Sequence, residues 1–197
     1  MSLVIRTLCV FCGAHTGARP EYAEAARTVG RMLAEQGIRL VYGAGNVGLM
    51  GILADSCLAA GGEVIGVIPD SLVRHEVAHV GLTELRVVNS MHERRAMMAD
   101  LADAFMALPG GIGTFEELFE IWTWSQLGLH GKPLGLLNVA GYFDHITALA
   151  DHAVREQFLR QQHRDVLLVD TDPQQLLAGL RQFTPLETPK WIDREQR

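Results

Sequence analysis

Short apolar runs alternate with segments of helical spacing along most of the chain, and this alternation restricts the possible fold more than any other feature. The apolar run at residues 5–11 precedes residues 20–36, where apolar side chains recur at helical intervals up to Gly37. Strands that alternate with helices form parallel βαβ units, and strands apolar throughout are covered by helices on both faces. The sequence therefore predicts a Rossmann-like, doubly wound α/β fold with a mainly parallel sheet flanked by helices.

The same alternation predicts the positions of the individual strands and helices. Strands are expected at residues 5–11, 38–42, 64–68, 85–88, 104–108, 134–138 and 166–169, and helices at 20–36, 47–60, 91–102, 114–127, 143–155 and 173–183. A length of 197 residues suits one domain with a full core, so residues 1–197 are expected to form a single nucleotide-binding domain. Residues 184–197 are polar and are expected to form a tail.

Charge and cysteine content exclude several classes of protein. A formal net charge of −6 argues against general affinity for nucleic acid or for an anionic membrane surface. The apolar runs are too short or too interrupted to cross a bilayer, and the first residues do not resemble an export signal. Three cysteines do not form a disulfide framework, so a cytoplasmic protein is expected.

Residues 109–114 read Pro-Gly-Gly-Ile-Gly-Thr and join an expected strand to an expected helix. Glycine allows the backbone to approach a ligand closely, and amides at a helix N-terminus bind phosphate. Thr114 would cap the helix or donate its hydroxyl to the same phosphate. A tight strand-to-helix turn without a ligand is the alternative interpretation of this loop.

Four segments are expected at one rim of the sheet, because ligands of such folds bind beyond the carboxyl ends of the strands. These segments are residues 13–17, 43–48, 69–79 and 109–114.

Residues 109–114 are called the glycine loop below. The helix after this loop is apolar on two sides, which predicts that it packs against more than one neighbour. Glu117 shares one apolar side with Ile121 and Trp124, and a buried carboxylate without a partner is costly. Arg94, on the preceding helix, is a suitable partner that would keep this acid ionised. Glu117 is therefore the leading candidate for chemistry, whereas the cluster at residues 91–95 that contains Arg94, taken alone, is more simply a charged helix surface.

Two segments resemble the LOG ("Lonely Guy") family. Residues 109–117 are similar to its Pro-Gly-Gly-x-Gly-Thr-x-x-Glu signature, and residues 90–98 are similar to its Met-His-x-Arg-Lys segment, with Arg95 where lysine is usual. Further landmarks match at 11–13, 42–45, 47–51 and 131–133, so that the resemblance covers about residues 7–183. Ala14 and Ala44 depart from the commoner serine and glycine, with little expected consequence.

The resemblance implies a phosphoribohydrolase that cleaves the N-glycosidic bond of a cytokinin riboside 5′-monophosphate or of AMP, giving the free base and ribose 5-phosphate. It implies catalytic roles for Arg94 and Glu117, no metal or other cofactor, and a homodimer. Glu117 would stabilise an oxocarbenium-like state, hold the ribose hydroxyls or orient the water. The substrate contacts implied are Gly45, Glu76, Arg95, Gly111, Ile112, Gly113, Thr114, Phe115, Glu116 and Thr123. The base, adenine or an N6-prenylated adenine, is left open.

Other interpretations of single motifs are weaker. Residues 75–79 match the zincin pattern His-Glu-x-x-His, but they fall in an expected rim loop and not on a helix. Residues 43–48 match Gly-x-Gly-x-x-Gly of dinucleotide-binding folds, yet no acid ends the next strand, and a second cradle for the same nucleotide is the preferred interpretation. Cys9 and Cys12 have Cys-x-x-Cys spacing in an expected buried strand, which favours core packing.

Two further alternatives concern the whole protein. Relatives of this kind have been labelled lysine decarboxylases, but a pyridoxal enzyme needs a Schiff-base lysine. The chain has only Lys132, in a turn, and Lys190, in the tail. The second alternative is a nucleotide- or molybdopterin-type carrier that binds without turnover.

Overall fold

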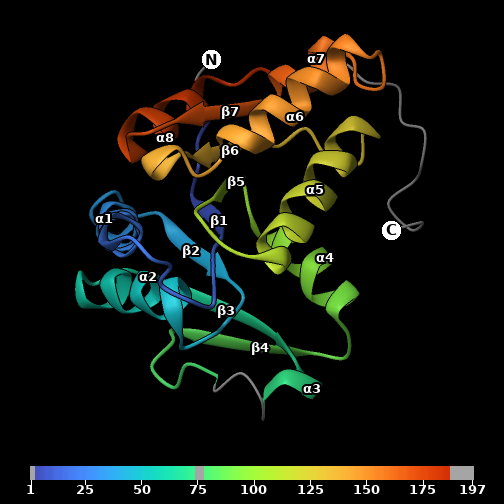
Figure 1. The fold of residues 1–197 in the computed structure, drawn as a ribbon. Coiled ribbons are helices and arrows are strands. Elements are labelled where there is room, and N and C mark those ends of the chain that lie inside the picture. The colour runs from blue at the N-terminus through green and yellow to red at the C-terminus, as the bar shows by residue number, and fades with distance from the viewer. Residues whose placement is uncertain (1–2, 74–77, 187–197) are drawn as a thin grey trace.

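A seven-stranded, all-parallel sheet forms the centre of the computed structural model, which describes residues 3–73 and 78–186 (Figure 1). The strand order is β4-β3-β2-β1-β5-β6-β7. The strands are β1 (Thr7–Phe11), β2 (Arg39–Tyr42), β3 (Val64–Pro69), β4 (Glu84–Val88), β5 (Ala104–Ala107), β6 (Leu134–Leu137) and β7 (Leu167–Asp170). The predicted Rossmann-like α/β class is confirmed, and every strand pair of this sheet is parallel.

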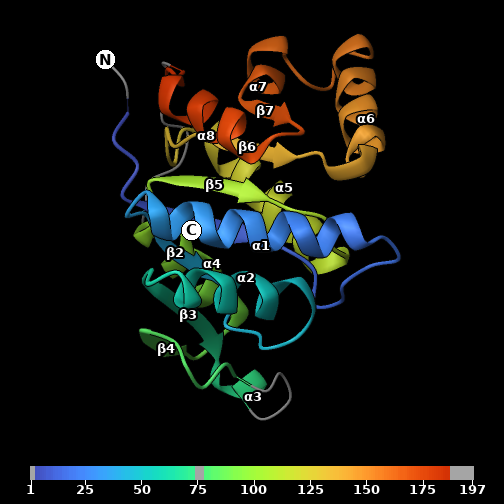
Figure 2. The ribbon, with the colours of Figure 1, turned by 90° about the vertical axis from the view of Figure 1, so that its left-hand side faces the viewer.

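Helices cover both faces of the sheet. They are α1 (Pro20–Glu35), α2 (Gly48–Ala59), α3 (Asp70–Val73), α4 (Met91–Leu101), α5 (Ile112–Gln126), α6 (Asp144–Arg155), α7 (Gln161–Asp165) and α8 (Pro173–Gln182), with a 3₁₀ turn at Val139–Gly141. Residues of α1, α2 and α8 share one core with the sheet, and residues of α4, α5 and α6 share the other. Figure 2 shows α1 and α2 side by side in front of the sheet.

The central strand β1 shows how the apolar runs produce two cores. Leu8 and Val10 pack into the core below α1 and α2, while Cys9 and Phe11 pack into the core of α4 and α5. Cys12 lies on the same side as Leu8, so the two cysteines of the Cys-x-x-Cys spacing belong to opposite cores. Both thiols are buried, which confirms core packing.

The expected elements agree with the structure except for boundaries and a few short helices. Helix α5 begins at Ile112 with Gly111 as the N-cap, so the prediction that Thr114 caps this helix is wrong. The short helices α3 and α7 and the 3₁₀ turn were not expected, because elements of three to five residues contain too little periodic pattern. Within residues 3–73 and 78–186, no helix is long and apolar enough to cross a membrane.

The topology leaves a crevice between β1 and β5. The chain builds β1 to β4 outward in one direction and then returns to place β5 on the other side of β1. The loops after these two neighbouring strands therefore diverge toward opposite faces, α1 lying over one core and α5 over the other. A ligand site is expected beyond the carboxyl ends of the strands at such a switch in strand order.

Candidate active site

A cavity of about 590 Å³ lies at this crevice. The loop after β1, the glycine loop with the first turns of α5, and parts of α2, α3 and α4 line it. Its lining residues are Cys12, Gly13, Ala14, His15, Thr16, Gly17, Tyr22, Leu49, Met50, Leu72, Met91, Arg94, Pro109, Gly110, Gly111, Ile112, Gly113, Thr114, Glu116, Glu117 and Tyr142. Three of the four expected rim segments contribute to it; residues 43–48 do not.

The glycine loop is held in place by a hydrogen bond to one of its carbonyl groups and by close packing around Gly110. The amide of Gly13 donates to the carbonyl oxygen of Pro109 at 3.0 Å. A Cβ atom at Gly110 would lie 2.1 Å from the Thr114 hydroxyl oxygen and 2.8 Å from the Gly13 nitrogen, so only glycine fits there. The N-cap Gly111 supplies no side-chain cap, and the first amides of a helix have no partners within the helix. The start of α5 therefore offers the cavity free amide donors and the positive end of a helix dipole.

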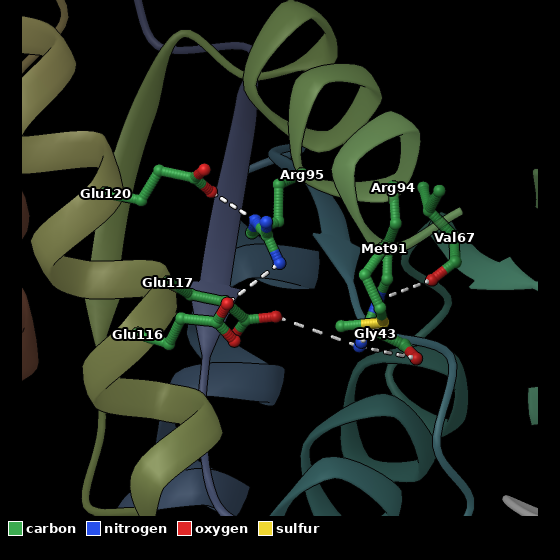
Figure 3. Close-up of polar contacts among 8 residues, drawn as sticks. All are labelled: Gly43, Val67, Met91, Arg94, Arg95, Glu116, Glu117 and Glu120. Atoms are coloured by element: carbon green, nitrogen blue, oxygen red, sulfur yellow. Dashed lines mark hydrogen bonds and ion pairs between the residues drawn. The ribbon is translucent and has the colours of Figure 1, made fainter.

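Glu117 lies one turn into α5 and lines the same cavity. It is only 9% exposed, as its position among apolar residues predicted. Its Oε1 atom lies 3.8 Å from Nη2 of Arg94, across from it on α4 (Figure 3). The buried carboxylate thus has the cationic partner expected from the sequence, and both groups line the cavity.

Arg94 is anchored by three protein groups besides Glu117. Its Nε atom donates to the carbonyl oxygen of Val67 and its Nη2 atom to that of Gly43, both at 3.1 Å. Its Nη1 atom lies 3.6 Å from the sulfur of Met91. A guanidinium with so many fixed contacts is oriented before any ligand arrives, which favours electrostatic catalysis.

The start of helix α4, which carries Arg94, is held by two side chains in a variant of the capping box. Ser90 accepts a hydrogen bond from the Glu93 amide at 3.1 Å, and the Glu93 carboxylate accepts from the Asn89 amide at 2.8 Å. This arrangement fixes the start of the helix and therefore the direction from which Arg94 enters the site.

The turn at residues 43–48 uses its glycines for packing. A Cβ at Gly43 would lie 1.8 Å from Nη2 of Arg94, and one at Gly45 would lie 2.4 Å from the terminal carbon of Met50. Gly48 packs on the backbone of Ala14 and His15. The interpretation of this turn as a second nucleotide cradle therefore lacks support, and Gly45, a predicted substrate contact, lies outside the cavity lining.

Of the other predicted contact residues, some line the cavity and some do not. Gly111, Ile112, Gly113, Thr114 and Glu116 line the cavity. Phe115 does not line it and instead stacks on Tyr142 with ring centres 6.3 Å apart. Glu76 lies outside the described residues.

Arg95 and Thr123 also lie outside the lining of the cavity. Arg95 pairs with Glu116, 3.0 Å away, and with Glu120, so it ties α4 to α5 (Figure 3). The Thr123 hydroxyl donates to the carbonyl oxygen of Phe119 at 2.7 Å, on an apolar groove between α5 and α6.

Several lining residues were not identified from the sequence as site residues. Tyr22 and Tyr142 contact each other edge to face, with ring centres 5.6 Å apart. Leu49, Met50, Leu72 and Met91 add apolar surface to the lining. No motif marks Tyr22, Leu72 or Tyr142. The family landmarks at residues 47–51 and 90–98 contain Leu49, Met50 and Met91, but they do not show that these side chains line one cavity, because their loops and helices meet only in the folded chain.

Cys12 lines the cavity but is a poor nucleophile. Burial raises the pKa of its thiol far above the ordinary range, and the neighbouring Glu117 carboxylate raises this pKa further. Reactive cysteines need the opposite environment, one that favours the thiolate. Carboxylate and guanidinium, not thiol, are therefore the candidate reactive groups.

The zincin interpretation finds no support in the described part of the chain. Nε2 of His79 pairs with the carboxylate of Asp55 at 2.8 Å, and its Nδ1 accepts from the Gly81 amide at 3.1 Å. Within residues 3–73 and 78–186, no group of three or more His, Cys, Asp or Glu residues could hold a metal ion. His75 and Glu76 of the motif lie outside the described residues.

Lys132 is placed away from the cavity. It precedes β6, at the edge of the sheet opposite to the carboxyl ends, and its ammonium donates to the carbonyl oxygen of Ala99 at 2.6 Å. Lys190 lies outside the described residues. The described part of the chain thus offers the cavity no lysine for a Schiff base, and pyridoxal chemistry does not fit its lining.

A family model and several known proteins are similar to this chain in sequence. Residues 50–180 match the family model described as "Possible lysine decarboxylase". The chain is 48% identical, over 89% of both chains, to the cytokinin riboside 5′-monophosphate phosphoribohydrolase of Rhodococcoides fascians. It is 46% identical to the enzyme LOG of rice, Oryza sativa, over 91% of this chain and 74% of that one. It is also 44% identical to LOG7 of Arabidopsis thaliana, over 91% of this chain and 83% of that one.

Solved structures share the fold at lower identity. The molybdenum cofactor binding protein of Rippkaea orientalis superposes with a TM-score of 0.66 at 20% identity, over 92% of this chain and 98% of that one. The molybdenum cofactor carrier protein of Chlamydomonas reinhardtii gives 0.68 at 19% identity, over 89% and 96%. The sequence relatives cover about nine tenths of this chain at more than twice that identity, and the chain therefore belongs to the LOG family.

Proposed function

We propose that this protein is a phosphoribohydrolase that cleaves the N-glycosidic bond of a purine riboside 5′-monophosphate, either AMP or a cytokinin nucleotide. The observation that carries the proposal is the Arg94–Glu117 pair, which lies in one cavity with the open N-terminus of α5. The named activity of the relatives from Rhodococcoides fascians and rice supports the same reaction.

In this reaction the bond between C1′ of the ribose and the base breaks, and its electron pair leaves with the base. A water oxygen then bonds to C1′, and its proton is balanced by the proton that the base takes up. The sugar carries positive charge in the transition state, as in glycoside hydrolysis. Glu117 stabilises this charge, holds the ribose hydroxyls or orients the water, and Arg94 acts on the base or on the charge developing there.

The phosphate end of the nucleotide is assigned to the start of α5. Gly111, Gly113 and Thr114 line the cavity with amides that have no partners within the helix. Ile112 and Glu116 share this lining and are kept as contacts. Contacts by Gly45, Glu76, Arg95, Phe115 and Thr123 stay predictions from the family resemblance.

We further propose that the protein forms a homodimer and acts in the cytoplasm. An apolar groove between α5 and α6, lined in part by Trp122, Ile146 and Leu159, is bordered by Phe119 and Leu149, which are 37% and 56% exposed. Exposed apolar surface of this kind is typical of contact sites between proteins. Light scattering after size exclusion tests the dimer, and Leu149→Glu is expected to shift its mass toward the monomer.

Incubation with AMP and with isopentenyladenosine monophosphate, followed by chromatography for the free base, tests the activity. Release of adenine or isopentenyladenine with equimolar ribose 5-phosphate is expected from at least one of them. If neither nucleotide yields a base, and nucleoside di- and triphosphates are also inert, the hydrolase proposal is wrong.

A carrier that binds without turnover is the second candidate, because proteins named as molybdenum cofactor carriers share the fold. Tight nucleotide or pterin binding by calorimetry, together with no released base, would favour it.

A further inference from the structure

The turn between β6 and α6 holds an unusual backbone conformation beside the cavity. Ala140 and Gly141 adopt φ angles of 51° and 73°, in the left-handed region that is unfavourable for alanine. The side chain of Asn138 supports this turn: its oxygen accepts from the Phe143 amide and its nitrogen donates to Asp144, both at 2.7 Å. Such a conformation persists only where surrounding contacts impose it, and it often marks a functional position.

Tyr142 follows directly after these two residues and lines the cavity. Its hydroxyl donates a hydrogen bond to the carbonyl oxygen of Gly110, in the glycine loop. Its ring packs between Phe115 of α5 and Tyr22 of α1, and the fully buried Phe143 beside it anchors the backbone. The turn thus presents one hydroxyl group to the loop in a defined place.

This hydrogen bond orients the peptide group between Gly110 and Gly111. A peptide unit is planar and trans, so fixing the direction of the Gly110 carbonyl also fixes the opposite direction of the Gly111 amide. The preceding carbonyl, of Pro109, is held by the Gly13 amide. Two successive carbonyls of a glycine-rich loop are therefore restrained, and with them the first amide available at the start of α5.

The hydroxyl of Tyr142 has a single proton, and it donates this proton in the hydrogen bond to the carbonyl oxygen of Gly110. It cannot donate to an anionic ligand without releasing the loop. In this arrangement the Tyr142 hydroxyl therefore holds the glycine loop and does not bind the phosphate itself.

We propose that Tyr142 is a positioning residue for nucleotide binding, which keeps the glycine loop in the shape that receives the phosphate group. This inference rests on the proposed function, since it assigns the phosphate to that loop. It predicts that loss of the hydroxyl weakens binding of any phosphate-bearing ligand and leaves the bond-breaking step largely unchanged.

The test is Tyr142→Phe, which keeps the ring and removes only the hydroxyl. We expect the KM for AMP to rise about three- to tenfold, the effect of one net hydrogen bond, while kcat changes less than about twofold. Inhibition by ribose 5-phosphate should weaken by the same factor, and inhibition by free adenine should not change. Tyr42→Phe is the matched control, because the buried Tyr42 hydroxyl has no hydrogen-bond partner among the described residues and Tyr42 does not line the cavity.

A second variant separates positioning from direct contact. Asn138→Asp keeps the acceptor for the Phe143 amide and places a negative charge against Asp144, so it perturbs the turn without entering the cavity lining. We expect it to raise the KM in the same direction as Tyr142→Phe. An unchanged KM in Asn138→Asp with a raised KM in Tyr142→Phe would overturn the proposal, because Tyr142 would then contact the ligand itself.

A purely structural role would also overturn it. In that case Tyr142→Phe would lower the Tm and leave KM and ribose 5-phosphate inhibition unchanged. Calorimetric titration of the variants with AMP gives the same comparison as a ratio of Kd values. If the protein binds AMP and releases no base, the proposed function fails while this ratio still decides the role of Tyr142.

Discussion

The guanidinium group of Arg94 occupies the space that any side chain at Gly43 would need. A Cβ atom there would lie 1.8 Å from Nη2 of Arg94, and the Gly43 carbonyl accepts a hydrogen bond from that same nitrogen at 3.1 Å. A turn at the end of β2 thus fixes the cation that pairs with Glu117 in the cavity lining. The glycine is required by the arginine, and Gly43 itself does not line the cavity.

Gly43→Ala is therefore expected to displace Arg94 while leaving most of the fold intact. A shift of about 1 Å in a catalytic group can cost about a hundredfold in rate, so kcat/KM for AMP should fall by about that factor. Steady-state kinetics with a thermal melt measures both effects. Gly179→Ala on α8 is the control, because its Cβ would lie 3.6 Å from Leu168, an ordinary contact. Activity of Gly43→Ala within about threefold of the parent would contradict the role given to this contact.

Glu117→Gln removes the negative charge and keeps the size of the side chain. Because that charge opposes the cationic transition state, we expect kcat to fall by about a hundred- to ten-thousandfold while the Kd for AMP changes little. Glu24→Gln serves as the control, since Glu24 forms exposed ion pairs on α1 and does not line the cavity. Loss of AMP binding with full turnover at saturation would show that Glu117 only holds the ribose.

The three cysteines are expected to resist alkylation in the folded protein. All are buried; burial raises the pKa of Cys57 to about 11 and raises the pKa values of Cys9 and Cys12 well above their usual range. At about pH 8 only about one thousandth of Cys57 would be thiolate, the form that reacts. Mass spectrometry after iodoacetamide should show no adduct on native protein and three adducts in urea. Rapid labelling of Cys12 in the native state would contradict its buried position at the cavity.

His163 is expected to make stability fall in mildly acidic solution. Burial, and then the nearby charge of Arg160, lower the pKa of this histidine below its ordinary value near 6.5. As the pH falls through about 6.5, the unfolded chain takes up a proton that the folded protein does not, so the free energy of unfolding decreases. The loss ends once the pH passes the lowered pKa of the folded state.

Urea unfolding at about pH 7.5 and 5.5 measures this effect. His163→Gln should lose less stability between the two values than the parent, while the exposed His145→Gln should behave like the parent. An equal pH dependence in the parent and in His163→Gln would assign the acid sensitivity to other groups.

The order of helices and strands was predictable because it depends on local periodicity. Apolar runs such as β1 and the two-sided apolar pattern of α5 are visible within ten to fifteen residues of sequence. The burial of Glu117 followed from the same pattern, since its neighbours at helical spacing are Ile121 and Trp124. The start of α5 was misplaced by two residues because Gly111 caps it without a side chain.

Glycines with similar sequence contexts perform different tasks, and no local pattern separates them. A Cβ atom at Gly111 or Gly113 would have no neighbouring atom within 4 Å, and both residues line the cavity, whereas Gly43 and Gly45 leave space for Arg94 and Met50. These neighbours lie on other elements, and Arg94 is 51 residues away from Gly43. Both loops were therefore predicted to bind the nucleotide.

The sequence by itself determined the α/β class, the glycine loop at the end of a strand and the buried acid one turn into the next helix, because each depends on residues close together in the chain. Only the tertiary structure decided which groups meet at the cavity: Arg94 against Gly43 and Glu117, Arg95 against Glu116 and Glu120, and Tyr142 against Gly110. These pairs join segments from different βαβ units. Arg94 meets Gly43 and Glu117 near the switch in strand order that places β5 next to β1, and Tyr142 reaches Gly110 because β6 lies next to β5.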